Sequence, residues 1–161
     1  MSIPPSIHGR LAICPTRFSA GAFGVLYVAQ AFETALAETL HHHEKFMRST
    51  GEPAGWTSQF RELILDVAAT LHDMTDAIAF ADALEPDDYG KAQRVGASLK
   101  AAGSDGILYP SVRNKGGLCL ALFYPDPAAA PVQGRHLDYH WNGDRVDFYR
   151  DLTNGAVFQV D

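Results

Sequence analysis

The sequence predicts an α+β fold with a mixed, largely antiparallel β core and flanking helices. About six short segments are rich in β-forming residues, whereas two or three segments show helical periodicity. The two kinds of segment do not alternate regularly, as they would in a doubly wound parallel sheet. Asn142-Gly143 stands between two strand-like runs and predicts a two-residue antiparallel hairpin. With 161 residues, the chain is expected to form one domain, 1–161.

The first third of the chain predicts two strands and a helix. Met1–Gly9 contains two prolines and is expected to be a surface lead-in, and Leu11–Ile13 is a possible short strand. Gly24–Ala29 is a clearer strand, because it is short, rich in β-formers and bounded by glycine. Apolar side chains from Phe32 to Met47 recur at helical spacing, and Gly51 is expected to end that helix.

The middle of the chain allows more than one prediction of secondary structure. Trp56–Asp76 is ambiguous: Leu63–Ala68 suggests a strand, but the surrounding pattern also fits a helix. Pro86–Tyr89 resembles a helix start, because its acidic side chains favour the positive end of a helix dipole. That helix would end at about Gly103.

The last third predicts strands. Gly106–Tyr109 is a short strand, and Leu118–Tyr124 is a continuous apolar run typical of a strand buried on both faces. His136–Trp141 and Arg145–Tyr149 flank the predicted hairpin turn, and Ala156–Val160 is a possible final strand.

Composition excludes several classes of protein. The net charge of −6 and the pI near 5.5 disfavour binding to a nucleic-acid backbone, which needs a basic face. No apolar run approaches the roughly 18 residues that a membrane span needs, and the first residues lack a secretory pattern. We therefore expect a cytoplasmic protein. Two cysteines, Cys14 and Cys119, make no disulfide framework, and Cys119 is expected to be inert packing.

Common catalytic motifs are missing. The sequence contains no P-loop, no Gly-x-Gly-x-x-Gly after a strand and no Gly-x-Ser-x-Gly. His41-His42-His43 suggests a metal site, but adjacent helical residues point about 100° apart and cannot share one ion. No metal is expected.

Charged and aromatic residues near the first predicted helix form a constellation. Arg17 precedes a strand, Tyr27 lies on it, and Glu38 lies on the helix nearly opposite its apolar stripe. His42 shares the face of Glu38, one turn further on. This face is either solvated or one wall of a cleft, and the pattern alone favours the solvated face.

The constellation resembles the RES domain, a family named for its arginine, glutamate and serine. Tyr27 follows Arg17 by ten residues, Glu38 follows by eleven more, and residues 109–113 read Tyr-Pro-Ser-Val-Arg. The resemblance covers about residues 10–145. It implies an ADP-ribosyltransferase-like fold that binds NAD+ and breaks its nicotinamide–ribose bond. It also implies the toxin of a bacterial toxin–antitoxin module, with an antitoxin partner that has an Xre-like helix-turn-helix region.

The resemblance implies roles for four residues. A carboxylate such as Glu38 would stabilise the oxocarbenium-like ribose, and Arg17 would bind the pyrophosphate. Tyr27 would stack on the nicotinamide ring. Ser111 would hydrogen-bond the carboxamide, the ribose or Glu38. As structural alternatives, Arg17 is a surface residue, Tyr27 a core tyrosine and Ser111 a turn residue.

Three further residues are candidates for the site. His42 is one helical turn from Glu38, so it would reach the carboxylate or the pyrophosphate, or lie on the helix surface. Asn114 is a candidate NAD+ contact through its proximity to Ser111. Arg113 is also a candidate through its proximity to Ser111, but the sequence favours a salt-bridged structural role for it.

The sequence supports two classes of function. The first is an NAD+-consuming toxin that transfers ADP-ribose to a cellular protein, with an NAD+ hydrolase or phosphorylase that depletes NAD+ as the alternative acceptor chemistry. The second is a non-catalytic binding module, which predicts a substitution at Glu38 or Arg17. Neither residue is substituted, which favours the enzyme.

Overall fold

The computed structural model describes the backbone of residues 7–12 and 16–160, and the side chains from residue 16 onward. Within these ranges, nine strands form one sheet in the order β4-β5-β6-β2-β1-β3-β7-β8-β9. In chain order the strands are β1 (Ile7–Ala12), β2 (Val25–Ala29), β3 (Trp56–Leu65), β4 (Leu71–Asp73), β5 (Gly106–Pro110), β6 (Leu118–Leu122), β7 (Val132–Trp141), β8 (Val146–Asp151) and β9 (Val157–Gln159).

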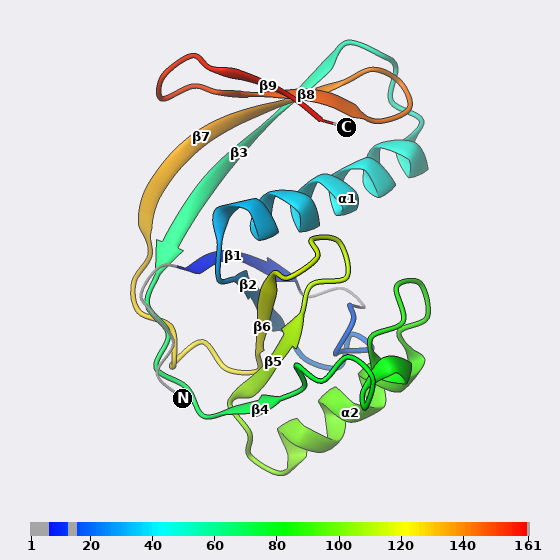
Figure 1. Ribbon diagram of the computed structural model, residues 1–161, viewed down its shortest axis with the longest axis vertical. Helices are drawn as coiled ribbons and strands as arrows, with labels where there is room; N and C mark the ends of the chain where they lie inside the picture. Colours follow the sequence, from blue (N-terminus) through cyan, green and yellow to red (C-terminus); the bar gives the residue numbers. More distant parts are fainter. Residues whose placement is uncertain (1–6, 13–15, 161) are drawn as a thin grey trace.

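The strand pairing confirms the α+β class and the largely antiparallel core. Among the described strands, β4 and β5 run parallel and every other neighbouring pair is antiparallel. The sheet bends strongly: β3 and β7 run together from the half containing β1 and β2 to the half containing β8 and β9 (Figure 1). An irregularity between Arg61 and Leu63 of β3 accompanies this bend.

Helix α1 (Phe32–Thr50) lies on the inner side of the bent sheet (Figure 1). Its apolar side packs against β7 and β8, where Met47, Leu137, Tyr139 and Trp141 form one buried cluster. The helix ends as predicted at Gly51, whose φ of 68° is left-handed and whose N–H donates to the Met47 carbonyl at 3.1 Å.

Helix α2 (Gly90–Ala101) follows a short 3-10 turn, η1 (Ala81–Ala83). The predicted start at Pro86 is too early, because Asp88 forms a turn before the helix and its carboxylate accepts the Gly90 N–H at 2.9 Å. The helix packs so closely on the segment before β2 that the Phe18 carbonyl leaves no room for a Cβ at Gly96. Neither helix in the described chain is long and apolar enough to cross a membrane.

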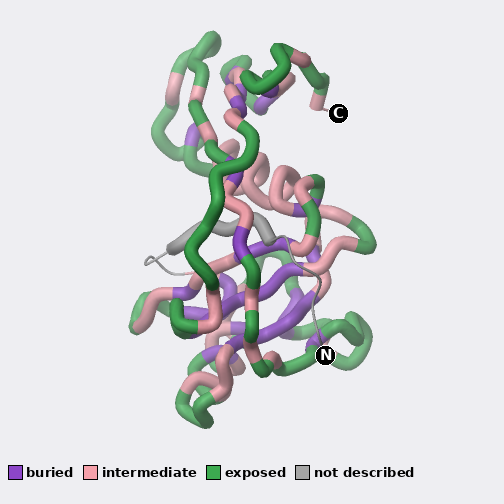
Figure 2. The backbone as a smooth tube through the Cα atoms, turned by 90° about the vertical axis from the view of Figure 1, so that its left-hand side faces the viewer, coloured by how far each residue is buried: buried purple, intermediate pink, exposed green. Residues whose placement is uncertain are grey.

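Strands β2, β5 and β6 are buried on both faces, as the continuous apolar run predicted for β6. Cys119 and Ala121 join the cluster that includes α2, whereas Leu120 packs with Leu65 on the opposite face. Figure 2 shows buried segments concentrated in this half of the molecule, in contrast to the exposed strand β9.

Several boundaries differ from the sequence predictions. Nine strands are described where about six were expected. The predicted lead-in Met1–Gly9 is wrong for residues 7–9, which belong to β1, whereas residues 1–6 lie outside the description. The predicted strand Leu11–Ile13 overlaps β1, and Ile13 itself is not described. Pairing with β7 and β5 resolves the ambiguous Trp56–Asp76 into β3 and β4.

The hairpin at Asn142-Gly143 exists, but its loop is longer than predicted. Residues 142–145 separate β7 from β8. The Asn142 side-chain oxygen accepts the N–H groups of Asp144 and Arg145, at 3.0 and 2.9 Å. This capping by the asparagine supports a four-residue loop in place of a two-residue turn.

Candidate active site

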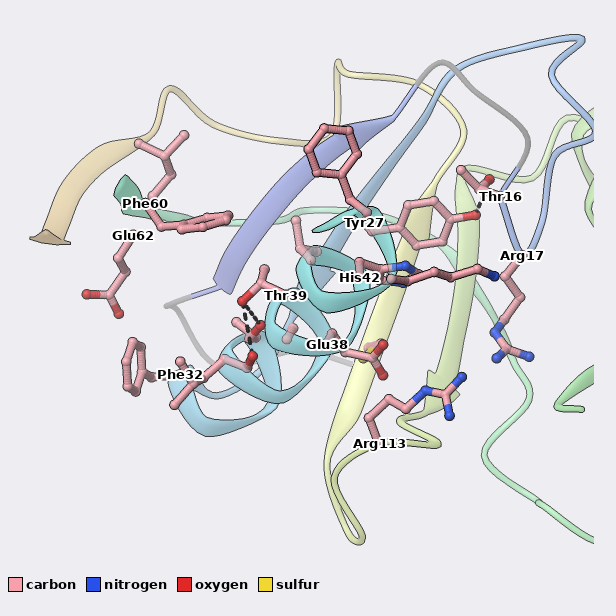
Figure 3. Close-up of a pocket in the computed structure, with 18 of the residues that line it drawn as sticks. Thr16, Arg17, Tyr27, Phe32, Glu38, Thr39, His42, Phe60, Glu62 and Arg113 are labelled. Atoms are coloured by element: carbon pink, nitrogen blue, oxygen red, sulfur yellow. Dashed lines mark hydrogen bonds between the residues drawn. The ribbon is translucent and has the colours of Figure 1, made fainter. Parts of the chain in front are cut away.

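A cavity of about 420 Å³ lies between α1, the inner face of the sheet and the segment around Tyr89. Tyr27, Tyr109 and Cys119 line it from β2, β5 and β6. Its other charged and polar lining residues are Thr16, Arg17, Glu38, Thr39, His42, Lys45, Ser49, Arg61, Glu62, Tyr89, Arg113 and Tyr139. Figure 3 shows Arg17, Tyr27, Glu38, His42 and Arg113 toward one side of the cavity.

Tyr27 holds the segment that carries Arg17. Its hydroxyl lies 2.7 Å from the Thr16 hydroxyl and accepts the Phe18 N–H at 3.0 Å. Burial raises the pKa of Tyr27, so the phenol stays protonated at neutral pH. From α2, the Gln93 amide donates to the Thr16 carbonyl at 2.9 Å. These bonds fix the Arg17 backbone on both sides of the residue.

Arg17 is 8% exposed and holds a neighbouring segment in place. Its Nη1 donates to the carbonyls of Ala83 and Glu85, at 3.4 and 2.8 Å. Its guanidinium lies over the Tyr89 ring at 4.7 Å. The Nε and Nη2 groups donate to none of the described residues, and the side chain lines the cavity.

Glu38 faces the cavity, so the solvated-face interpretation of α1 is wrong at this residue. The Ser111 hydroxyl donates to Glu38 Oε1 at 2.7 Å, which fixes the carboxylate in place. The second carboxylate oxygen can then accept a hydrogen bond from a ligand hydroxyl or face a developing positive charge.

Ser111 is 7% exposed and is part of a tight turn as well as a partner of Glu38. Its oxygen accepts the N–H groups of Arg113 and Asn114, at 3.1 and 3.0 Å. The Asn114 amide donates to the Thr34 hydroxyl of α1 at 2.8 Å. The turn and the helix are thereby bonded together, which sets the distance between Ser111 and Glu38.

The structure therefore separates the candidates into two groups. Arg17, Tyr27, Glu38 and His42 line one cavity. Ser111 supports Glu38 from behind, and Asn114 bonds the Ser111 turn to α1 and lies outside the lining. The role of Asn114 as an NAD+ contact stays a prediction.

Arg113 is ion-paired and also lines the cavity. Its Nη2 donates to the Pro86 carbonyl at 3.1 Å and lies 3.8 Å from the exposed Asp87 carboxylate. Its side chain is 20% exposed and lines the cavity. The guanidinium therefore contributes positive charge beside Glu38.

Cys119 and Tyr109 line the floor of the cavity, where they are shielded from water. Burial raises the pKa of the Cys119 thiol to about 12, and the nearby Glu38 carboxylate acts in the same direction. The thiol is therefore protonated, consistent with the expected packing role. Burial also raises the pKa of Tyr109 well above its usual value. Electrostatic interactions with a substrate are stronger above such a floor than in water.

The opposite side of the cavity is aromatic (Figure 3). The Phe60 and Tyr139 rings stack at 4.3 Å, and the Tyr139 hydroxyl lies 2.9 Å from the Thr39 hydroxyl. Glu62 is nearly buried there and accepts the Arg135 N–H at 2.8 Å. This side provides apolar contact area.

The three adjacent histidines point in different directions. The His41 and His42 rings lie 5.3 Å apart, whereas the His43 ring packs edge-on against Phe60. No group of three His, Cys, Asp or Glu side chains that could hold a metal ion is found within the described residues.

Among the cavity-lining residues that sequence reasoning missed are Lys45, Phe46, Tyr89 and Tyr109. Lys45 and Phe46 follow Glu38 by seven and eight residues, so the helical spacing that linked Glu38 to His42 could have found them. Tyr89 and Tyr109 reach the cavity through the tertiary fold, and no local pattern indicates them.

The fold and the cavity together define the class of the protein. It is an α+β protein whose bent, largely antiparallel sheet surrounds a helix, and the cavity described above is lined by two carboxylates and four cationic side chains. The RES domain model matches residues 4–142, and the chain belongs to the RES domain family. Curated proteins give no match.

A solved structure shares the fold. The chain is similar to the crystal structure of the M. tuberculosis MbcT-MbcA toxin-antitoxin complex, with a TM-score of 0.56 and 14% sequence identity. The similarity covers 84% of this chain and 84% of the matched chain. At this identity the likeness concerns the fold.

Proposed function

We propose that this protein is the NAD+-consuming toxin of a bacterial toxin–antitoxin module. It would cleave the nicotinamide–ribose bond of NAD+ and transfer ADP-ribose to a cellular protein. The observation that carries the proposal is the Glu38 carboxylate, held by Ser111 at 2.7 Å in a cavity that Arg17 and Tyr27 also line. Membership of the RES domain family supports it.

The proposed reaction breaks the bond between the ribose C1′ and the nicotinamide nitrogen. The bonding electron pair stays on that nitrogen, so nicotinamide leaves as a neutral base and the ribose becomes an oxocarbenium-like cation. An acceptor oxygen or nitrogen then bonds to C1′ and loses its proton. Glu38 stabilises the developing cation through its fixed negative charge, without becoming a nucleophile.

The neighbouring residues fit binding roles. The Nε and Nη2 groups of Arg17, which donate to none of the described residues, can bond a phosphate oxygen or a ribose hydroxyl. The Tyr27 ring lines the cavity on the Glu38 side and offers an aromatic face to nicotinamide. His42 lies one helical turn from Glu38 and completes this side of the cavity.

The proposal extends to partners and location. An antitoxin with an Xre-like helix-turn-helix region would block the cavity in the cell. The fold shared with a chain of a toxin–antitoxin complex supports such a partner. NAD+ would be a co-substrate and no metal would be needed. Because NAD+ is a cytoplasmic metabolite, the toxin would act in the cytoplasm.

The test is nicotinamide release from NAD+ by the purified protein and by Glu38→Ala, with and without phosphate and with a cell extract as a source of acceptor protein. We expect release that depends on Glu38, together with ADP-ribose bound to a protein of the extract. Free ADP-ribose or phosphorylated ADP-ribose, with no labelled protein, would instead indicate a hydrolase or a phosphorylase. Release that is equal in the Glu38→Ala protein would contradict the proposal.

A further inference from the structure

Beyond Glu38, helix α1 continues along the cavity wall. His42, Lys45, Phe46 and Ser49 line the cavity after Glu38, at spacings that keep them on one side of the helix. With a rise of 1.5 Å per residue, Lys45 and Phe46 lie about 10 and 12 Å from Glu38 along the axis. The wall therefore extends well past the carboxylate.

The cavity carries a charge opposite to that of the whole chain. Its described lining includes four Lys or Arg side chains and two carboxylates, whereas the chain has a net charge of −6. The basic residues are Arg17, Lys45, Arg61 and Arg113, and the acidic ones are Glu38 and Glu62. Such a local excess of cations attracts an anionic ligand.

Two of these cations, Lys45 and Arg113, line the cavity from different segments of the chain. Burial lowers the pKa of His41, and the charges of Arg113 and Lys45 lower it further, while Glu38 and Asp87 act in the opposite direction. Lys45 comes from α1 and Arg113 from the turn after β5, so an anion between these segments would meet a cation from each side. Lys45 forms no ion pair with the acidic side chains that the structure describes.

Phe46 follows Lys45 on α1 and is an exposed aromatic residue. It is 59% exposed, although it lines the cavity, and its ring contacts none of the other described aromatic rings. An exposed ring of this kind is a stacking surface for a planar heterocycle such as a nucleobase.

We propose that the exposed part of α1 binds the adenosine diphosphate end of NAD+, with Lys45 and Arg113 on the diphosphate and Phe46 stacked on adenine. This assignment rests on the proposed function, because it takes NAD+ as the substrate. It adds to that function an assignment of each end of NAD+ to a part of the cavity. Along NAD+ the order is glycosidic carbon, diphosphate, adenine, and along the cavity wall the order is Glu38, Lys45, Phe46.

The experiment compares three substrates: NAD+, nicotinamide mononucleotide, which has one phosphate, and nicotinamide riboside, which has none. We expect Lys45→Gln to reduce the preference for NAD+ over nicotinamide riboside about tenfold, through the loss of one charge-assisted contact. We expect Phe46→Ala to reduce the preference for NAD+ over nicotinamide mononucleotide about tenfold, through the loss of stacking on the base.

Conservative and distant variants serve as controls. Lys45→Arg and Phe46→Trp should keep most of the preference, because they keep the charge and the ring. Arg94→Gln on α2 and Phe158→Ala on β9 change exposed residues outside the cavity lining and should change neither preference. A loss of preference in these two controls as well would overturn the assignment.

Direct binding provides a readout that needs no turnover. Calorimetric titration with ADP-ribose and with inorganic pyrophosphate should show weaker binding of both by Lys45→Gln, and weaker binding of ADP-ribose alone by Phe46→Ala. If both variants bind ADP-ribose as tightly as the wild type while nicotinamide release proceeds, the assignment fails and the proposed function stands. If the wild type neither releases nicotinamide nor binds ADP-ribose, both fail.

Discussion

The two ends of the cavity are built differently. At the inner end, Glu38 and Tyr27 each make a hydrogen bond of 2.7 Å, to the hydroxyls of Ser111 and Thr16. At the outer end Lys45 pairs with no described carboxylate, and the Phe46 ring is exposed. A prearranged inner end suits a reaction step, because its charges need no rearrangement when the transition state forms.

An outer end with few internal contacts suits recognition, because its side chains gain partners when the substrate binds. The comparison therefore predicts different kinetic effects. Substitutions at the inner end should lower kcat, whereas those at the outer end should act on KM and on substrate preference.

The largest expected effect is at Glu38. Glu38→Gln keeps an acceptor for the Ser111 hydroxyl but removes the negative charge. Nicotinamide release at saturating NAD+ should fall about 10²- to 10³-fold, while ADP-ribose still binds. Glu52→Gln, which lies outside the cavity lining, is the matched control and should behave as the wild type. A fall in affinity with an unchanged kcat would contradict the division between the two ends.

The second effect concerns stability, at Gly117 in the turn that carries Ser111. A Cβ at Gly117 would collide with the Thr34 hydroxyl and press on the Asn114 amide. Gly117→Ala should therefore lower the free energy of unfolding by about 1–3 kcal/mol, measured by urea denaturation. Adding Thr34→Ala should recover part of the loss by making room. Equal stability of Gly117→Ala and the wild type would show that the inner end is less rigid than its contacts indicate.

Ser111→Ala tests the hydrogen bond that holds the Glu38 carboxylate in place. It removes the donor to Glu38 and the acceptor of the Arg113 and Asn114 N–H groups. We expect kcat for nicotinamide release to fall about tenfold with little change in KM, in line with the loss of one hydrogen bond to a charged group. Ser98→Ala, an exposed residue of α2, is the control. A rise in KM at constant kcat would place Ser111 in substrate binding instead.

A smaller effect distinguishes two histidines on different faces of α1. Burial is the main cause that lowers the pKa of both His41 and His43, but Arg113 and Lys45 act only on His41. Bound ADP-ribose would offset those cations, so it should raise the His41 pKa by roughly half a unit and leave His43 unchanged. NMR titration of the two rings measures this. An equal response of both rings would argue against an anion site beside His41.

The smallest expected effect is on stability against pH. His43 Nε2 is buried and has no hydrogen-bond partner among the described residues. Its lowered pKa means that the unfolded chain binds the proton more readily, so the free energy of unfolding should decrease as pH falls below about 6.5. His43→Phe, which suits the aromatic cluster with Phe60, should flatten this decrease in urea denaturation at pH 5 and 7.5. An unchanged slope would show that other groups cause it.

The sequence was most informative where the signal is local. The apolar spacing after Phe32 and the glycine at position 51 determine where α1 runs and ends. The unbroken apolar run from Leu118 determines a strand buried on both faces. These patterns depend on neighbours along the chain, so they also sufficed for the α+β class and the resemblance to the RES domain family.

The sequence was least informative where a strand depends on a distant partner. Trp56–Asp76 fits more than one local structure, and pairing of β3 with β7 and of β4 with β5 decides it. The early strand β1 likewise depends on pairing with β2 and β3.

The tertiary structure alone decided how the candidate residues work together. Ser111 meets Glu38 across 73 residues, and Arg17 meets the Glu85 carbonyl across 68. Whether the polar side of α1 faces water or a cavity follows from how the sheet bends around it, which no local periodicity encodes. The sequence thus determined the residue types and their order, and contacts over long separations determined the site.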